Sequence, residues 1–348
     1  MGEVVIINAT QETIDNEDVS ETVLFYFKFW FGLVATNCLT ALSFLTNIVN
    51  MVLFVKQGLK ERVNFTLFCL SICDLMGAVF VTSLTRALSG DVWIAGIVVD
   101  WSSYLYVVVW GRNMFVDLST VLTVFISIER CTCVVTPFSF NTSFIARKSK
   151  LIVFTIVSLV VVLYLPNLAT IRFETIHNET NNVSIFFLEY TEIYVSFQKF
   201  NDFVFGFLVA FGCEICIFVC AVLMYKGLKK SSEVRRNTMS AKELAERGAD
   251  SPRLSNKERR VVKMILVLAT FYMVTTMPQL VAIWLRLLLT DMQDNLTLSL
   301  FMCYTMAYSS ALYGAFSAFI YYNFSSSYRV ALSRVFGIYI RRTELTKI

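Results

Sequence analysis

The chain has 348 residues, of which 56% are hydrophobic and only 16% are charged, and its mean hydropathy is +0.63. Soluble domains carry about a quarter charged residues, so this composition excludes a soluble enzyme, a disordered regulator and a secreted disulfide scaffold. The net charge of +4 is too small for a nucleic-acid-binding protein, and a single histidine makes a multi-histidine metal site or a histidine-dependent catalytic pair hard to build. The sequence therefore predicts an all-α integral membrane protein that is not an enzyme.

Seven apolar blocks are each long enough to cross a bilayer, which takes about 20 residues of helix. Stretches such as Leu151–Leu165 are apolar on every face, which favours helices in lipid over the alternating strands of a membrane barrel. In chain order the blocks cover 23–55, 64–88, 101–133, 150–171, 196–225, 261–289 and 297–322. We therefore expect three regions: an N-terminal tail at 1–22, a seven-helix bundle at 23–323 with a long polar loop at 226–262, and a short amphipathic helix and tail at 324–348.

The positions of the basic residues predict the orientation of the chain in the membrane. Three connections between the blocks and the C-terminal segment together hold 24 of the 30 Lys and Arg residues. Because basic connections stay in the cytoplasm, we expect a plasma-membrane protein with its N-terminus outside and its C-terminus inside. Asn-X-Ser/Thr triplets on the outer side are then candidate glycosylation sites; they lie at Asn8, Asn178, Asn182 and Asn295.

Polar residues at similar depth in several blocks predict a buried cluster. Ionisable groups inside a membrane helix are costly and usually have a function. Asp74 lies at the depth of Asn47 and Ser119, and Ser317 belongs to the same level of the seventh block. The oxygen atoms of this cluster would either bind a sodium ion or a proton, or form a purely structural hydrogen-bond network. The sequence leaves both interpretations open.

Charged residues at the predicted cytoplasmic ends of two blocks can form a latch. Glu129 and Arg130 close the third block, and Glu258 opens the sixth, twenty residues before Pro278 or about 30 Å of helix. This spacing places Glu258 level with Arg130, so an ion pair can hold the two helices together. Pro278 removes a backbone donor and should kink the sixth helix. The alternative is ordinary basic anchoring at the membrane interface.

Seven spans with these motifs resemble a rhodopsin-like (class A) G-protein-coupled receptor. Three segments, 54–67, 126–137 and 228–233, further resemble the mollusc-type chemosensory receptor group, which is also similar to some invertebrate neuropeptide receptors. The resemblance implies an extracellular small-molecule or peptide ligand, a heterotrimeric G-protein, kinases and arrestin as partners, and outward movement of helix six on activation. The residues that carry the resemblance are Asn47, Asp74, Glu129, Arg130, Cys131, Pro137, Glu258, Pro278 and Tyr321, followed by the segment 324–329.

The chain departs from the family pattern at several positions. Thr276 replaces the Trp of helix six, and Ser317 with Ala318 replaces the Asn-Pro pair of helix seven. Leu105 stands where the family has a cysteine bonded to the second outer loop, and that loop, 172–200, has no cysteine either. All nine cysteines lie in or beside apolar blocks, so we expect no structural disulfide.

The candidate ligand-binding residues are Arg112, Asp117, Trp284 and Tyr308. Arg112 lies 18 residues before Arg130, five turns farther out on the third predicted helix, where the family resemblance places a ligand contact. Arginine at this level favours an anionic group such as a carboxylate over a cationic amine. The alternative is an internal ion pair with a carboxylate from Asp117, Asp202 or Glu214. Nearby aromatic residues either line the pocket or only pack; they are Trp101, Tyr104, Trp110, Phe115, Trp284 and Tyr308.

A membrane transporter or channel is the alternative function, and it would require a continuous polar path through the bundle. An opsin is excluded because a retinal Schiff base needs a lysine in the seventh helix, and no lysine lies between Lys263 and Lys347. We expect no cofactor other than the sodium ion considered at Asp74, and membrane lipids as further partners.

Overall fold

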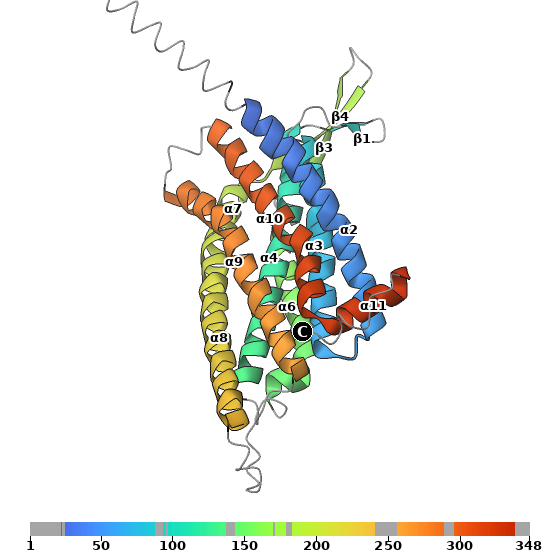
Figure 1. Ribbon diagram of the computed structural model, residues 1–348. Coiled ribbons are helices and arrows are strands. Elements are labelled where there is room, and N and C mark those ends of the chain that lie inside the picture. Colours follow the sequence, from blue (N-terminus) through green and yellow to red (C-terminus); the bar gives the residue numbers. More distant parts are fainter. Residues whose placement is uncertain are drawn as a thin grey trace, which may run out of the picture.

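A computed structural model of the chain shows a long bundle of helices that run alternately up and down (Figure 1). The model describes residues 22, 25–87, 93–94, 97–99, 101–136, 143–169, 171–178, 183–240, 256–288 and 296–337. In chain order the bundle contains η1 (Phe27–Ala35) running into α2 (Thr36–Gln57), α3 (Arg62–Ala87), α4 (Trp101–Val135), α6 (Phe144–Ala169), α7 (Tyr194–Asn201) running through η2 (Asp202–Val209) into α8 (Ala210–Ser240), α9 (Asn256–Leu288) and α10 (Leu296–Phe324).

Six helices within the described residues are long and apolar enough to cross a membrane. They are η1 with α2, then α3, α4, α6, the continuous α7–α8 helix, and α9. The seventh, α10, is 29 residues long, carries no charged side chain and lies in the same bundle. The number and order of the helices agree with the seven predicted blocks.

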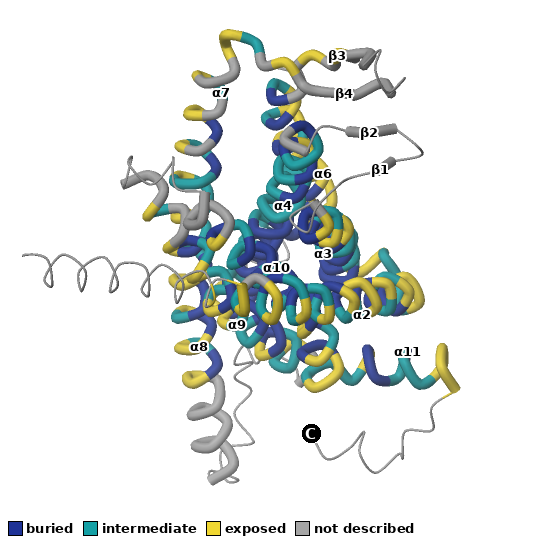
Figure 2. The backbone as a smooth tube through the Cα atoms, turned by 90° about the horizontal axis from the view of Figure 1, so that it is seen from above, coloured by how far each residue is buried: buried dark blue, intermediate teal, exposed yellow. Residues whose placement is uncertain are grey.

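The helix α4 forms the centre of the bundle. In its most apolar stretch 72% of the residues are buried, against 22% for α6 at the periphery. Seen from above, the buried faces of the helices turn toward one another and the exposed faces turn outward (Figure 2). The outward faces are apolar: Phe154 of α6 is 71% exposed, and Leu151 and Leu159 are 57% exposed. Apolar exteriors of this extent are stable in lipid rather than in water.

The helices α2 and α10 approach each other closely at a glycine. Thr46 Oγ1 donates a hydrogen bond of 3.1 Å to the carbonyl oxygen of Gly314. A Cβ atom at Gly314 would lie 2.1 Å from Ser43 Oγ, well inside van der Waals contact. Glycine at this position therefore sets the distance between the two helices.

The break between α10 and α11 (Ser326–Phe336) is fixed by capping. Ser325 has an extended backbone, and its side chain accepts a hydrogen bond of 3.2 Å from the backbone N–H of Tyr328. Arg329 Nη1 donates to the last carbonyl groups of α10, at Tyr322 (2.8 Å) and Asn323 (3.0 Å). These bonds turn the chain, so that α11 packs beside α2 as a separate short helix (Figure 1). Below, this end of the bundle is called the α11 end.

The opposite end of the bundle carries a small sheet that the sequence did not predict. The strands are β1 (Trp93–Ile94), β2 (Ile97–Val99), β3 (Ile171–Asn178) and β4 (Val183–Tyr190), in the spatial order β1-β2-β4-β3. The hairpin of β3 and β4 is antiparallel, with Ile171 opposite Tyr190, and β2 runs parallel to β4. The all-α prediction holds for the bundle, and this sheet end is an addition to it.

The polar connection after α8 is shorter than expected. The sequence predicts a loop over 226–262, but α8 continues to Ser240 and α9 begins at Asn256. The correction has a simple cause, because Lys, Glu, Met and Arg in this stretch have high helix propensity and continue the helix beyond its apolar part. The remainder of the loop, 241–255, lies outside the described residues.

Three of the candidate glycosylation sites, Asn8, Asn182 and Asn295, also lie outside the described residues, as do the ends of the chain. Asn178 is the last residue of β3, and its side chain is not described.

Candidate functional site

Arg112 of α4 is buried among three helices, with 2% of its surface exposed. Its Nη1 donates to Asn113 Oδ1 at 2.9 Å, and its Nη2 donates to Gln279 Oε1 of α9 at 3.2 Å. On α10 the same Nη2 reaches the carbonyl oxygen of Met306 at 2.7 Å and Ser310 Oγ at 2.8 Å. The Nε atom is buried and has no hydrogen-bond partner. Every acceptor around this guanidinium is therefore electrically neutral.

No carboxylate within the described part of the chain forms an ion pair with Arg112. Asp117 accepts a short hydrogen bond from the hydroxyl of Tyr164 on α6. Glu214 of α8 accepts one of 2.5 Å from Thr276 of α9. The internal ion pair considered from the sequence is thus not formed with Asp117 or Glu214, and the side chain of Asp202 is not described. A buried charge without a charged partner at contact distance is costly, and an incoming anion would relieve that cost.

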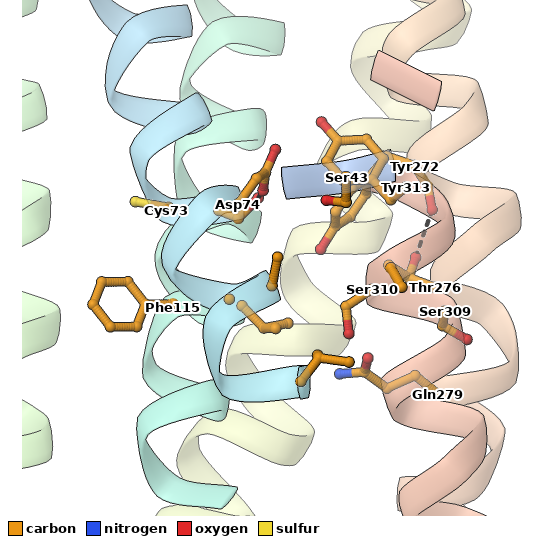
Figure 3. Close-up of a pocket in the computed structure, with 16 residues that line it drawn as sticks. Ser43, Cys73, Asp74, Phe115, Tyr272, Thr276, Gln279, Ser309, Ser310 and Tyr313 are labelled. Atoms are coloured by element: carbon orange, nitrogen blue, oxygen red, sulfur yellow. Dashed lines mark hydrogen bonds between the residues drawn. The ribbon is translucent and has the colours of Figure 1, made fainter. Parts of the chain in front are cut away.

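A narrow cavity connects this region with the predicted polar cluster (Figure 3). Gln279 and Ser310, which bind Arg112, line one part of it, and Asp74 and Ser119 line another. The volume open to the centre of a water-sized molecule is about 30 Å³. This volume accommodates about two water molecules. Further lining residues are Ser43, Phe115, Tyr272, Thr276 and Tyr313.

The aromatic residues expected around Arg112 do not form one pocket with it. Trp284 packs against Phe207 and Phe211, with ring centroids 5.3 and 5.7 Å apart, on the α8 side of the bundle. Tyr308 stacks on Phe31 of η1 at 4.2 Å. Of the other predicted rings, Phe115 alone lines the cavity, and the side chain of Trp101 is not described.

The predicted cluster of Asn47, Asp74, Ser119 and Ser317 forms two hydrogen-bonded groups. Ser119 Oγ donates to Asp74 Oδ1 at 2.6 Å. Asn50, which the sequence interpretation missed, donates through Nδ2 to Asn47 Oδ1 at 3.4 Å and to Ser317 Oγ at 3.2 Å. Its position three residues after Asn47, on the same helix face, was the available signal.

A tyrosine of α11 extends the second group to the α11 end. Tyr328 is 2% exposed, and its hydroxyl donates to Asn50 Oδ1 at 2.6 Å. Its ring lies 5.8 Å from that of Tyr321, which in turn contacts Phe54 at 5.3 Å. Tyr321, one of the residues that carry the family resemblance, is therefore held between α2 and α11.

The residues of the predicted latch gather at the α11 end. Arg130 Nη2 lies 3.0 Å from Glu129 Oε1, and Arg62 Nε of α3 lies 3.8 Å from the same oxygen. Glu258 belongs to the first turn of α9, which begins at this end of the bundle (Figure 1). The charged residues of the predicted latch therefore lie at one end of the bundle: Glu129, Arg130 and Glu258. Within this group, Arg130 contacts Glu129.

A helical bundle that spans the membrane seven times, with a buried polar interior and a short helix at one end, has the architecture of a seven-transmembrane receptor. The family model of the 7 transmembrane receptor (rhodopsin family) matches residues 46–313, and the chain belongs to this family. The fold is similar to that in the crystal structure of squid rhodopsin, with a TM-score of 0.61 and 17% sequence identity over 94% of this chain and 86% of that one. No curated protein matches the sequence significantly.

These comparisons confirm the predicted all-α seven-helix bundle and the resemblance to rhodopsin-like receptors. The chain is accordingly a multi-pass membrane protein of a receptor family. All nine cysteines are free thiols, so the departure from the family's disulfide pattern, noted at Leu105, is present in the folded chain.

Proposed function

We propose that the chain is a plasma-membrane G-protein-coupled receptor that binds an anionic extracellular ligand at Arg112. The single observation that carries this proposal is the buried guanidinium of Arg112, which has only neutral partners and an unpartnered Nε atom. A carboxylate would form charge-assisted, bidentate hydrogen bonds that these neutral acceptors do not provide. The ligand would be a chemosensory cue or a neuropeptide, reaching the site from the sheet end, which faces outside.

The contacts of Arg112 suggest how binding drives activation. Gln279, which Arg112 binds on α9, directly follows Pro278, where the helix lacks a backbone donor. A ligand that draws Arg112 away from Gln279 frees this turn, and the part of α9 at the α11 end then swings outward. The ligand favours this state because it binds it more tightly than the resting state.

At the α11 end, which faces the cytoplasm, the movement opens a cavity beside Arg130 for a heterotrimeric G-protein. Glu129, Arg130 and Glu258 form the latch that holds the closed state, and Tyr321 lies at its border. Kinases and arrestin are proposed to act on the polar connection after α8 and on the C-terminal segment, and membrane lipids to surround the apolar faces.

A sodium ion at Asp74 is proposed to stabilise the resting state. The support is geometric: Asp74 and Ser119 present oxygen atoms to a cavity that has room for an ion and a water molecule. The ion would neutralise this half-buried carboxylate, which accepts a hydrogen bond from Ser119.

The experiment compares Arg112→Gln with Arg86→Gln, which removes an exposed cation at the sheet end. Cells that express each variant are screened with a library of carboxylates and peptides, with calcium and cyclic-nucleotide readouts and surface staining for expression. We expect the wild type and Arg86→Gln to respond to the same compounds and Arg112→Gln to lose the response while it still reaches the surface. A normal response from surface-expressed Arg112→Gln would refute the proposal.

A further inference from the structure

We propose that the ligand recognised at Arg112 is a small zwitterion, whose anionic group binds Arg112 and whose cationic group binds Glu214. The inference deepens the proposed function and rests on it, because it requires a ligand site at Arg112. It assigns a role to Glu214, a carboxylate that the sequence interpretation considered only as an internal partner of Arg112.

Two buried side chains of opposite charge each have one atom without a partner. The Nε atom of Arg112 is a donor, and the Oε2 atom of Glu214 is an acceptor; both are buried and without a hydrogen bond. Arg112 is 2% exposed and Glu214 is 7% exposed. Buried polar atoms without partners are rare in folded proteins and cost about 1–3 kcal/mol each, more when the group is charged. A ligand with both a donor and an acceptor would satisfy the two atoms together.

Arg112 and Glu214 each form a hydrogen bond with the same turn of α9. Glu214 is bound by Thr276, and Arg112 binds Gln279, three residues further along that helix. Side chains three residues apart on a helix are neighbours, at about 5–6 Å between their Cβ atoms. Thr276 and Gln279 both line the cavity, as labelled in Figure 3. A short ligand that crosses this turn from α4 to α8 therefore reaches both charges.

The other carboxylates of the region, Asp117 and Asp74, are half-buried and already accept hydrogen bonds. Asp117 is bound by Tyr164 and acts on the charge of Arg112 only at a distance. Asp74 is bound by Ser119 in another part of the cavity. Arg112 and Glu214 do not pair with each other; each instead contacts neutral groups. An anion alone would leave Glu214 unmatched, and a cation alone would leave Arg112 unmatched, so a ligand that carries both charges is favoured.

The aromatic residues that line the cavity favour a ligand with an apolar middle part. Tyr272 lines the cavity from the same helix as Thr276 and Gln279, and Phe115 lines it from α4 on the other side (Figure 3). Because the free volume is only about 30 Å³, the ligand has to be small, and it displaces the side chains of this turn as it enters. Amino acids and ω-amino carboxylates have this chemistry: a carboxylate, a short hydrocarbon chain and an ammonium group.

The experiment measures thermal unfolding of the purified full-length receptor in lipid nanodiscs, without a G-protein. The probes are unbranched ω-amino carboxylates of increasing chain length, each compared with the alkyl carboxylate and the alkylamine of the same length. We expect the amino carboxylates to raise the unfolding temperature, with one optimal length, and to bind at least tenfold more tightly than either single-charge counterpart. Arg112→Gln and Glu214→Gln should each remove this preference, whereas Lys199→Gln and Glu189→Gln, exposed at the sheet end, should retain it.

Glu214→Asp provides a second test that keeps the charge. Shortening this side chain by one methylene should move the optimal probe to a longer chain. If no amino carboxylate binds more tightly than its single-charge counterparts, the zwitterion proposal is overturned. A third outcome is that the alkyl carboxylate binds as tightly as the amino carboxylate, and that Arg112→Gln removes this binding. The proposal of an anionic ligand at Arg112 would then hold, and the proposed role of Glu214 would be wrong. Failure of the proposed function itself would appear in the cellular screen, as a response that does not depend on Arg112.

Discussion

Arg112 of α4 donates a hydrogen bond of 3.2 Å to Gln279 of α9, the residue directly after Pro278. The same guanidinium also binds α10 through Met306 and Ser310. Three helices are therefore joined by one side chain at the level where the family has a tryptophan on helix six and this chain has Thr276. The contact is a physical candidate for the switch that the missing tryptophan would otherwise provide.

Gln279→Leu should raise ligand-independent signalling. The substitution removes the acceptor on α9, so Arg112 no longer constrains the turn after Pro278 and keeps its bonds to Asn113 and to α10. We expect basal G-protein activation to increase about threefold, which corresponds to about 0.7 kcal/mol, within the net range for one hydrogen bond. Val281→Ala, at a position 56% exposed on the same helix, is the control and should not change it. Equal basal activity in the two variants would contradict the switch role of Gln279.

Glu258→Ala should also raise basal activity, by releasing the latch at the α11 end. Glu258 lies at the same end of the bundle as Arg130 and Glu129, and a partly exposed ion pair contributes about 0.2–1 kcal/mol. Nucleotide exchange on a purified G-protein measures the effect, which should be at most fivefold. Glu258→Asp, which keeps the charge, should remain close to wild type. If the alanine variant shows no increase, Glu258 does not restrain the closed state.

Tyr328→Phe should destabilise the receptor although the ring remains. The change removes the 2.6 Å hydrogen bond to Asn50 Oδ1 and leaves that buried acceptor unmatched, at a cost of about 1–3 kcal/mol. We expect a lower thermal unfolding temperature in detergent. Tyr322→Phe, at an exposed position next to Tyr321, is the matched control. Identical unfolding temperatures for the two variants would show that the Asn50 contact contributes nothing.

Gly314→Ala should separate α2 from α10. The new Cβ atom would lie 2.1 Å from Ser43 Oγ, and such overpacking costs about 1–3 kcal/mol. Gly212→Ala, where a Cβ atom meets nothing within 4 Å, should be neutral or slightly stabilising because alanine favours helix. The unfolding temperatures of the two variants test the close approach of α2 and α10. Equal unfolding temperatures would refute it.

Asp74→Asn should abolish stabilisation by sodium. The variant keeps an oxygen near Ser119 but loses the charge that would bind the ion. We expect the wild type to unfold at a higher temperature in sodium chloride than in choline chloride, and the variant to be insensitive to the exchange. If the wild type also unfolds at the same temperature in both salts, the hydrogen bonds of Asp74 have a structural role only.

The sequence predicted the bundle because lipid imposes a simple length and hydropathy requirement on each helix. It also located Arg112, Asp74 and Glu129, since ionisable residues stand out against an apolar background. It did not predict the partners of these residues. Gln279 and Ser310 are ordinary polar residues in the sequence, and they become significant only because α9 and α10 bring them to one guanidinium.

Two further features depended on long-range packing and were missed. The hairpin of β3 with β4 was interpreted as a loop: each strand has 8 residues, but β4 does not alternate strictly between polar and apolar residues. The sequence also left open whether the aromatic residues line a pocket or only pack, and it could not show that Trp284 and Tyr308 find ring partners on different elements. Helical spacing gives the face of a helix on which a residue lies, and it does not give the neighbour that this face meets.

The parallel pairing of β2 with β4, through Val98 with Ile185 and Val99 with Phe186, joins the start of α4 to the hairpin. In the family this connection is made by the disulfide that is absent here. Backbone hydrogen bonds between strands break on heating, but thiol reagents do not affect them. The rim of the proposed ligand entrance should therefore keep its shape in a reducing medium that would break a disulfide at the same place.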